Sequence, residues 1–388
     1  MPQLTEPANL PPAPYTQDGR VMAGTTLRQT IRVTAGGARF RLRLSNVFGG
    51  APLPITAASV ALPAGGRAGV SDIEPGSAKP VRFGGRPSVM VPAGREAVSD
   101  PLDFTAAGGS NLTVTLYLAA GQASERITSH PGSRTTSYLV RGDRLTATGL
   151  GDTTAVDHWY FLSGVDVSAP ANTGAVVLLG DSLTDGRGST TNGNDRWPDQ
   201  LFDRIGSSGV AIANEAAGGN AVLSGGLGPT AVSRFDRDVL GRDGVRWLIV
   251  FEGVNDLGGG PAGTADDLIG AYRQFIAKAH AAGIHAYGAT LTPFGGHGYD
   301  DVAGVHEAAR QRVNSWIRGA GSFDAVLDFD RAVRDPANPR RLRPGYDSGD
   351  HLHLSPAGYA TLAASVPAAL FSAPTDPARR RLRPASPG

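Results

Sequence analysis

Residues 175–182 read Ala-Val-Val-Leu-Leu-Gly-Asp-Ser. Five consecutive apolar residues rich in Val and Leu, bounded by glycines, predict a strand that is buried on both faces of a parallel sheet. Ser182 follows at the carboxyl end of this strand, the edge where ligands bind in open α/β sheets. Thr184 stands where a Gly-x-Ser-x-Gly elbow has its second glycine, so that motif is absent. The stretch predicts an α/β fold with Ser182 as a candidate nucleophile. A polar turn with Ser as a helix cap is the alternative.

From residue 174 onward, strand patterns alternate with helix patterns. Further strands are expected at 210–214, 246–251, 285–289 and 325–328, and helices at 197–207, 231–240, 265–282, 305–319 and 356–370. This alternation predicts a three-layer α/β/α domain built on a five-stranded parallel sheet.

The first 170 or so residues have a different pattern. Residues 39–44 and 112–118 alternate polar and apolar side chains, which is typical of half-buried strands. Residues 26–33 and 159–167 add strands, and Gly/Pro-rich turns separate them. We therefore expect an antiparallel β-sandwich of jelly-roll type. The arginines of 39–44 are interpreted as a solvated sheet face, with a glycan-binding face as the alternative.

Two of the α/β strands end in turns that offer hydrogen-bond donors. Strand 210–214 leads into Ala-Ala-Gly-Gly-Asn at 216–220, and strand 246–251 leads into Gly-Val-Asn-Asp at 253–256. A glycine lets the backbone approach a ligand closely, and Asn255 adds a side-chain N–H. Each motif alone is typical of an ordinary turn. Three strand ends that present Ser, Gly and Asn to one crevice instead predict donors for an oxyanion.

A candidate base lies near the end of the chain. Asp350 and His353 are three residues apart, and Ser355-Pro356 follows as a helix start. This spacing allows the Asp350 carboxylate to reach Nδ1 of His353 and to fix its tautomer. His351 is the competing base. A solvated loop with two histidines, or a metal site of His351, His353 and Asp350, are further alternatives, although the spacing matches no standard zinc site.

Four motifs resemble, in their order along the chain, those of the SGNH, or GDSL, hydrolases. They are Gly-Asp-Ser-Leu at 180–183, a Gly, Gly-x-Asn-Asp at 253–256 and Asp-x-x-His at 350–353. The resemblance implies a catalytic triad. In it Ser182 is the nucleophile, His353 the base and Asp350 the residue that orients the base.

The same resemblance implies an oxyanion hole formed by the Ser182 N–H, the Gly219 N–H and Asn255 Nδ2, with Gly218 as the alternative glycine. Residues 196–199, 289–294 and 346–350 are also similar to the two-domain bacterial branch of this family. Some members of that branch act on acetylated plant polysaccharides.

The predicted function is therefore a serine esterase. Short-chain acyl or acetyl esters, including acetylated carbohydrates, are the expected substrates, because no long apolar lid segment lies between the strands. A lipase or phospholipase is the first alternative, and a non-catalytic glycan-binding protein is the second.

Four segments are expected: an N-terminal extension at 1–20, the β-sandwich at 21–168, the hydrolase domain at 172–371 and a disordered tail at 372–388. With 388 residues there is room for two cores. A net charge of +1 gives no reason to expect nucleic acid or an anionic membrane as a partner. No metal or other cofactor is expected, and the absence of Cys excludes disulfides and thiolate chemistry.

Two properties stay open at this stage. The first 15 residues lack the basic start and apolar core of a signal peptide, so the protein is either intracellular or its leader is missing from this sequence. The oligomeric state is not indicated by any pattern in the chain.

Overall fold

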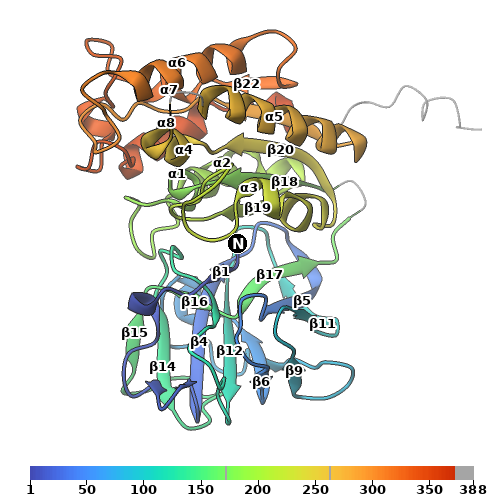
Figure 1. Cartoon of the computed structure of the whole chain (residues 1–388). Coiled ribbons are helices and arrows are strands. Elements are labelled where there is room, and N and C mark those ends of the chain that lie inside the picture. Colours follow the sequence, from blue (N-terminus) through green and yellow to red (C-terminus); the bar gives the residue numbers. More distant parts are fainter. Residues whose placement is uncertain (171–172, 262–263, 372–388) are drawn as a thin grey trace, which may run out of the picture.

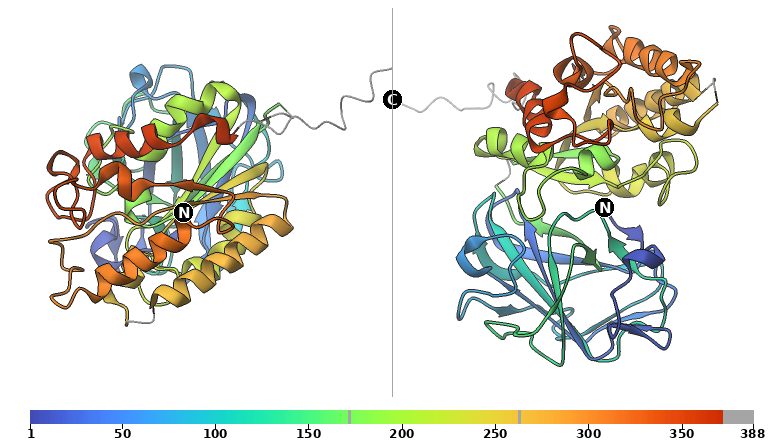
Figure 2. Two further views of the ribbon diagram at one scale, coloured as in Figure 1. Left: turned by 90° about the horizontal axis from the view of Figure 1, so that it is seen from above. Right: turned by 90° about the vertical axis from the view of Figure 1, so that its left-hand side faces the viewer.

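The computed structural model describes residues 1–170, 173–261 and 264–371. A strand-rich N-terminal half and an α/β C-terminal half stack on one another, with the N-terminus between them (Figure 1). Figure 2 shows the same two-part arrangement from the side. The expected disordered tail at 372–388 and residues 171–172 of the expected linker lie outside the described residues.

The N-terminal half contains two main antiparallel sheets. The larger has the order β15-β14-β4-β12-β7-β8. Its strands are β4 (Thr25–Arg32), β7 (Ala57–Ala61), β8 (Lys79–Pro80), β12 (Asn111–Leu118), β14 (Ser137–Arg141) and β15 (Thr154–Val156). The smaller has the order β10-β5-β11, with β17 also paired to β5. Its strands are β5 (Gly37–Ser45), β10 (Glu96–Val98), β11 (Leu102–Ala106) and β17 (Leu162–Val167).

Shorter elements complete this half. They are the sheet β1-β13-β16 (Gln3–Leu4, Thr128–His130, Trp159–Tyr160), the pairs β2-β3 (Thr16–Gln17, Arg20–Val21) and β6-β9 (Leu53–Ile55, Val89–Val91), and 3-10 turns at Pro7–Asn9 and Ala64–Gly66.

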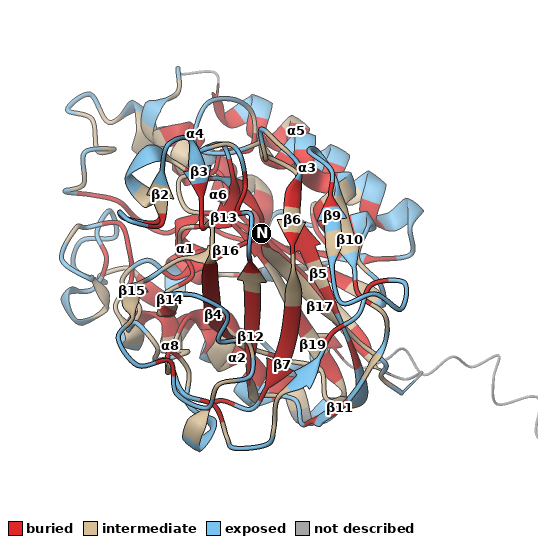
Figure 3. Cartoon of the chain, turned by 90° about the horizontal axis from the view of Figure 1, so that it is seen from below, coloured by how far each residue is buried: buried red, intermediate tan, exposed pale blue. Residues whose placement is uncertain are grey.

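Alternating side chains of the two main sheets form one buried cluster. Leu42 and Leu44 of β5 pack in it together with Leu27 of β4 and with Val114 and Leu116 of β12. Figure 3 shows the buried residues along these strands. The N-terminal half is therefore the expected antiparallel sandwich.

Three details differ from the sequence-based expectation. The strand expected at 159–167 is two strands, because Phe161 between them adopts a φ of +63°. The arginines of β5 do not all face solvent, because Arg43 forms an ion pair with Asp166 and approaches Asp243 of the C-terminal half. The segment 1–20, expected as an extension, packs onto the sandwich through β1, which pairs with β13.

The C-terminal half is built on the expected five-stranded parallel sheet, with the order β19-β18-β20-β21-β22. The strands are β18 (Gly174–Gly180), β19 (Val210–Ala216), β20 (Val245–Phe251), β21 (His285–Ala289) and β22 (Ala325–Leu327). Side chains of β18 alternate between two cores: Val176 and Leu178 join one, and Val177 and Leu179 join the other. Burial on both faces explains the continuous apolar run in the sequence.

Helices cover both faces of this sheet (Figure 2). They are α1 (Ser182–Asp185), α2 (Trp197–Ile205), α3 (Ala231–Phe235), α4 (Val254–Gly259), α5 (Thr264–Ala281), α6 (Val305–Arg318), α7 (Phe329–Val333) and α8 (Pro356–Ser365). Short 3-10 turns follow at Gly206–Ser208, Pro344–Tyr346 and Ala368–Phe371. The helix expected at 231–240 is α-helical only to Phe235 and then π-helical over Asp236–Leu240, and the helix expected at 356–370 ends at Ser365.

Candidate active site

Three strand ends meet at one edge of the parallel sheet. Gly180 of β18 is in register with Ala216 of β19 on one side and with Phe251 of β20 on the other. Ser182, Gly219 and Asn255 therefore leave adjacent strands within a few residues of the same edge. This is the sheet edge at which the sequence predicts the site.

Ser182 is the first residue of α1, a single turn of helix. The Asp181 carboxylate caps this turn by accepting a hydrogen bond from the Leu183 N–H. Gly186 ends the turn with a φ of +93°, and a Cβ there would lie 2.4 Å from Cγ of Arg196, so only glycine fits. Ser182 is 6% exposed. The local sequence thus fixes a hydroxyl at the sheet edge.

The structure brings His353 and Asp350 to this serine. Ser182 Oγ lies 2.8 Å from His353 Nε2, and His353 Nδ1 lies 2.6 Å from Asp350 Oδ2. Asp350 Oδ1 also accepts the His353 backbone N–H over 2.8 Å, so the carboxylate holds both the loop and the ring. The three side chains form one continuous chain of hydrogen bonds.

The electrostatics of this chain favour a neutral imidazole and an ionised carboxylate. Burial lowers the pKa of His353, and the adjacent Asp350 opposes this without reversing it. For Asp350, burial alone would raise the pKa, but hydrogen bonds from the backbone and the ring of His353 together hold it below its ordinary value. A neutral Nε2 is then available to accept a proton from Ser182.

The competing histidine lies elsewhere. His351 adopts a φ of +65°, and its Nδ1 is 2.6 Å from Asp347 Oδ2, so its ring is paired with a different carboxylate. Its side chain is 52% exposed. Within the part of the chain that the structure describes, no group of three or more His, Asp or Glu side chains is arranged to hold a metal ion.

The two glycines after β19 have different environments. The Gly218 N–H donates to Asp185 Oδ2 over 3.1 Å, whereas no acceptor for the Gly219 N–H is found among the described residues. Gly219 has a φ of +70°, in the left-handed region that favours glycine. Of the two, Gly219 has the N–H that is free to meet a ligand.

Asn255 is held from both sides by groups in the crevice. Its Nδ2 donates to the Asn220 carbonyl over 2.7 Å, and its Oδ1 accepts from the Tyr299 hydroxyl over 2.8 Å. These contacts fix which end of the amide carries the N–H groups, and leave the second Nδ2 hydrogen for a ligand. Tyr299 was not identified from the sequence, because it lies 44 residues from Asn255 in a loop without a recognisable motif.

A buried ionic network supports the sheet edge and was also missed. Arg234 donates to the carbonyls of Gly180 and Glu215 and to Asn220 Oδ1, and its side chain is fully buried. It pairs with Glu252, whose pKa burial raises to about 7 although Arg234 opposes that rise. Arg234 thereby links the ends of β18 and β19 with the loop that carries Gly219.

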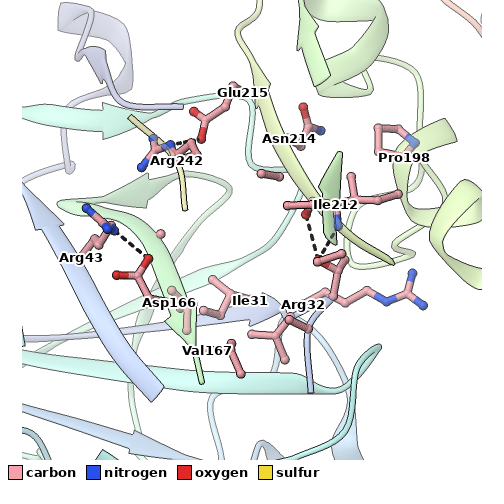
Figure 4. Close-up of a pocket in the computed structure, with 18 of the residues that line it drawn as sticks. Ile31, Arg32, Arg43, Asp166, Val167, Pro198, Ile212, Asn214, Glu215 and Arg242 are labelled. Carbon is pink, nitrogen blue, oxygen red and sulfur yellow. Dashed lines mark hydrogen bonds and ion pairs between the residues drawn. The ribbon is translucent and has the colours of Figure 1, made fainter. Parts of the chain in front are cut away.

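A cavity of about 530 Å³ lies between the two halves of the molecule. Figure 4 shows its lining, in which Arg43 meets Asp166 and Arg242 meets Glu215. Ile31, Val167 and Ile212 contribute apolar walls. Ser182 is not part of this lining, whereas His130 and Asp185 are.

None of the helices in the described residues has the length and hydropathy required to cross a bilayer. The model of the GDSL-like Lipase/Acylhydrolase family matches residues 178–361, which include Ser182, Gly219, Asn255, Asp350 and His353. A search of curated proteins returns no match.

Solved structures give weaker likenesses. A lipolytic protein of the G-D-S-L family from Desulfitobacterium hafniense is 23% identical, with 49% of this chain and 96% of that chain covered and a TM-score of 0.39. An acetylxylan esterase from Geobacillus stearothermophilus is 17% identical, with 50% and 91% covered and a TM-score of 0.38. At these values the likenesses carry no argument about substrate. The family match, together with an α/β fold and a serine at the sheet edge, identifies the C-terminal half of this chain as a GDSL-like acylhydrolase domain, and the protein as a carboxylic ester hydrolase.

Proposed function

We propose that the protein hydrolyses short-chain acyl esters, with acetylated carbohydrates as the leading substrate class, through an acyl-enzyme on Ser182. One observation carries this proposal: the hydrogen-bond chain from Ser182 Oγ through His353 to Asp350, with distances of 2.8 and 2.6 Å. A serine, an imidazole and a carboxylate in this order are the parts of a nucleophile that is activated by a general base. We also propose that the hydrolase domain spans 172–371 and the accessory sandwich 21–168.

In the first half of the reaction, His353 Nε2 takes the proton from Ser182 Oγ while this oxygen attacks the acyl carbonyl carbon. The carbonyl oxygen becomes an oxyanion that accepts hydrogen bonds from the Ser182 N–H, the Gly219 N–H and Asn255 Nδ2. The protonated His353 then gives its proton to the departing alcohol oxygen. The ester C–O bond breaks, and the acyl group stays on Ser182.

In the second half, water replaces the alcohol. His353 takes a proton from the water, whose oxygen attacks the acyl carbon, and returns it to Ser182 Oγ as the acid leaves. Asp350 stays ionised and stabilises the imidazolium that forms in each half. Asp350 also keeps Nδ1 protonated, so that Nε2 faces the serine.

The rim of the site supports a polar substrate. Arg187 is 4.0 Å from Asp350 and its side chain is 62% exposed. His297, Tyr299 and His351 lie on neighbouring turns: the rings of His297 and Tyr299 are 4.5 Å apart, and His351 lies beside Gly296. Hydrogen-bonding side chains at the mouth suit a hydroxylated alcohol better than a long acyl chain.

The test combines labelling with a substrate series. A serine-directed phosphonate should label Ser182 alone, and Ser182→Ala should lose turnover while keeping its melting temperature. p-Nitrophenyl esters of rising chain length, compared with acetylated xylan, test the substrate class. Turnover that is highest with acetyl esters supports the proposal. A preference that rises with chain length would favour the lipase alternative, and labelling at another serine would overturn the mechanism.

A further inference from the structure

A buried ion pair joins the sandwich to the candidate active site. His130 Nε2, from β13 of the N-terminal half, lies 2.7 Å from Oδ1 of Asp185, the last residue of α1. Both side chains are less than a tenth exposed. Nδ1 of the same ring lies 2.8 Å from the Met1 carbonyl oxygen. Since both ring nitrogens face acceptors, both must donate for the pair to be satisfied.

Asp185 transmits this contact to the loop after β19. Its second oxygen, Oδ2, accepts the Gly218 N–H over 3.1 Å. Gly218 directly precedes Gly219, whose N–H is a proposed oxyanion donor. Asp185 also lies on the same turn of helix as Ser182, because its N–H donates to the Asp181 carbonyl. One carboxylate therefore fixes the nucleophile's helix relative to the oxyanion loop.

Gly132 of the sandwich also lies against the Asp185 carboxylate. A Cβ on Gly132 would lie 1.9 Å from Asp185 Oδ2, so only glycine at 132 leaves room for the carboxylate. Burial alone would raise the pKa of Asp185, but the charge and hydrogen bond of His130 and the charge of Arg196 lower it. The acceptor thus stays ionised, and charge-assisted hydrogen bonds are shorter and stronger than neutral ones.

From these contacts we infer that His130 of the sandwich is a positioning residue for ester hydrolysis, which acts through Asp185 on the Gly218–Gly219 loop. This inference rests on the proposed role of Gly219. It assigns the N-terminal half a part in catalysis besides any binding role. Removing the His130 imidazole frees Asp185 and loosens the loop, which weakens stabilisation of the oxyanion but not binding of the ground-state ester.

The main experiment measures His130→Ala with p-nitrophenyl acetate, using phosphonate titration to count active sites. We expect kcat per titrated site to fall roughly 10-fold, less than the 10²–10³ for deleting a whole oxyanion donor, with KM within about 2-fold. A boronic acid that forms a tetrahedral adduct on Ser182 should lose affinity in parallel, because it uses the same donors.

Three further variants make the test specific. His130→Gln keeps a side-chain N–H donor and should recover most of the lost kcat. Gly132→Ala should lower kcat although His130 is intact. Arg32→Ala is the matched control, because Arg32 also joins the two halves, through Asp199 and Asp203, without touching Asp185. Its kcat should stay at the wild-type value.

A His130→Ala enzyme with wild-type kcat per titrated site and only a lower melting temperature would overturn the inference, as would equal losses in Arg32→Ala. Should His130→Ala fail to fold, a wild-type kcat per titrated site in both Gly132→Ala and Asp185→Asn would overturn the inference as well. Failure of the proposed function gives a different result, because the phosphonate would then not label Ser182 even in the wild-type protein.

Discussion

The hydroxyl of Tyr299 donates a hydrogen bond to Oδ1 of Asn255 over 2.8 Å. The tyrosine ring lies where a side chain on Gly258 of α4 would be, since a Cβ there would come within 2.1 Å of it. An amide held at its oxygen cannot rotate without losing this bond, so Nδ2 stays directed at the Asn220 carbonyl, one residue from Gly219. The proposed oxyanion donor is therefore oriented before any substrate arrives.

Tyr299→Phe should lower kcat roughly 10-fold with little change in KM, because the donor stays present but is no longer fixed. Steady-state kinetics with p-nitrophenyl acetate measure the effect. Tyr287→Phe is the matched control, since its hydroxyl donates to the Leu370 carbonyl instead. A normal kcat in Tyr299→Phe would show that Asn255 needs no such support.

Asn255→Ala should lower kcat by roughly 10²–10³, the usual loss for one oxyanion donor. Asn255→Asp should do at least as badly, because a carboxylate accepts hydrogen bonds and repels the developing oxyanion. If Asn255 only stabilised its turn, Asn255→Ala would have a lower melting temperature and normal turnover. Asn255→Asp would then be both stable and active. Melting curves and kinetics on both variants separate these outcomes.

His353→Ala should be nearly as damaging as Ser182→Ala, and the double variant little worse than either, because a nucleophile and its base act as one unit. His351→Ala is the control and should keep most activity, since its ring pairs with Asp347. Asp350→Asn should cost on the order of 10⁴ in kcat if triads elsewhere are a guide. A greater loss in His351→Ala than in His353→Ala would contradict the assignment of the base.

The rate should depend on pH through His353. Catalysis needs its neutral form, and burial lowers its pKa from the ordinary histidine value, so kcat/KM should rise with pH and level off with a midpoint below that of a free histidine. The positive charge of Arg187 contributes to this lowering, so Arg187→Ala should move the midpoint to higher pH. Profiles of kcat/KM against pH, from pH 4 to 9, measure the midpoint for the wild-type and Arg187→Ala enzymes. An unmoved midpoint, or one that moves down, would contradict this electrostatic account.

Arg234→Met should reduce the free energy of unfolding by about 3–5 kcal/mol, because Glu252 would be left buried without its partner and Asp238 would keep only Arg237. Urea unfolding at pH 7 measures the change. Arg237→Met is a milder control, because Arg237 is 30% exposed and pairs only with Asp238 among these acids. A loss in Arg234→Met no larger than in the control would mean that the network contributes little.

The sequence by itself determined where most strands and helices lie and which short motifs carry the candidate catalytic residues. A run of apolar residues such as 175–179 is buried on both faces wherever it lies, so it predicts a central parallel strand from local composition alone. Asp350 and His353 are three residues apart on one loop, and their contact follows from this short spacing. The helix starts at Trp197 and Pro356 follow from the prolines in their first turns.

Only the tertiary structure decided which distant groups meet. His130 reaches Asp185 across 55 residues and Tyr299 reaches Asn255 across 44, and no periodicity or short motif encodes either contact. Two further contacts belong here: the Asp185 carboxylate engages the Gly218 N–H, and Asp243 of the C-terminal half approaches Arg43. Such contacts depend on how distant segments pack, within the α/β half and between it and the sandwich, whereas strands, turns and caps depend on a few neighbouring residues.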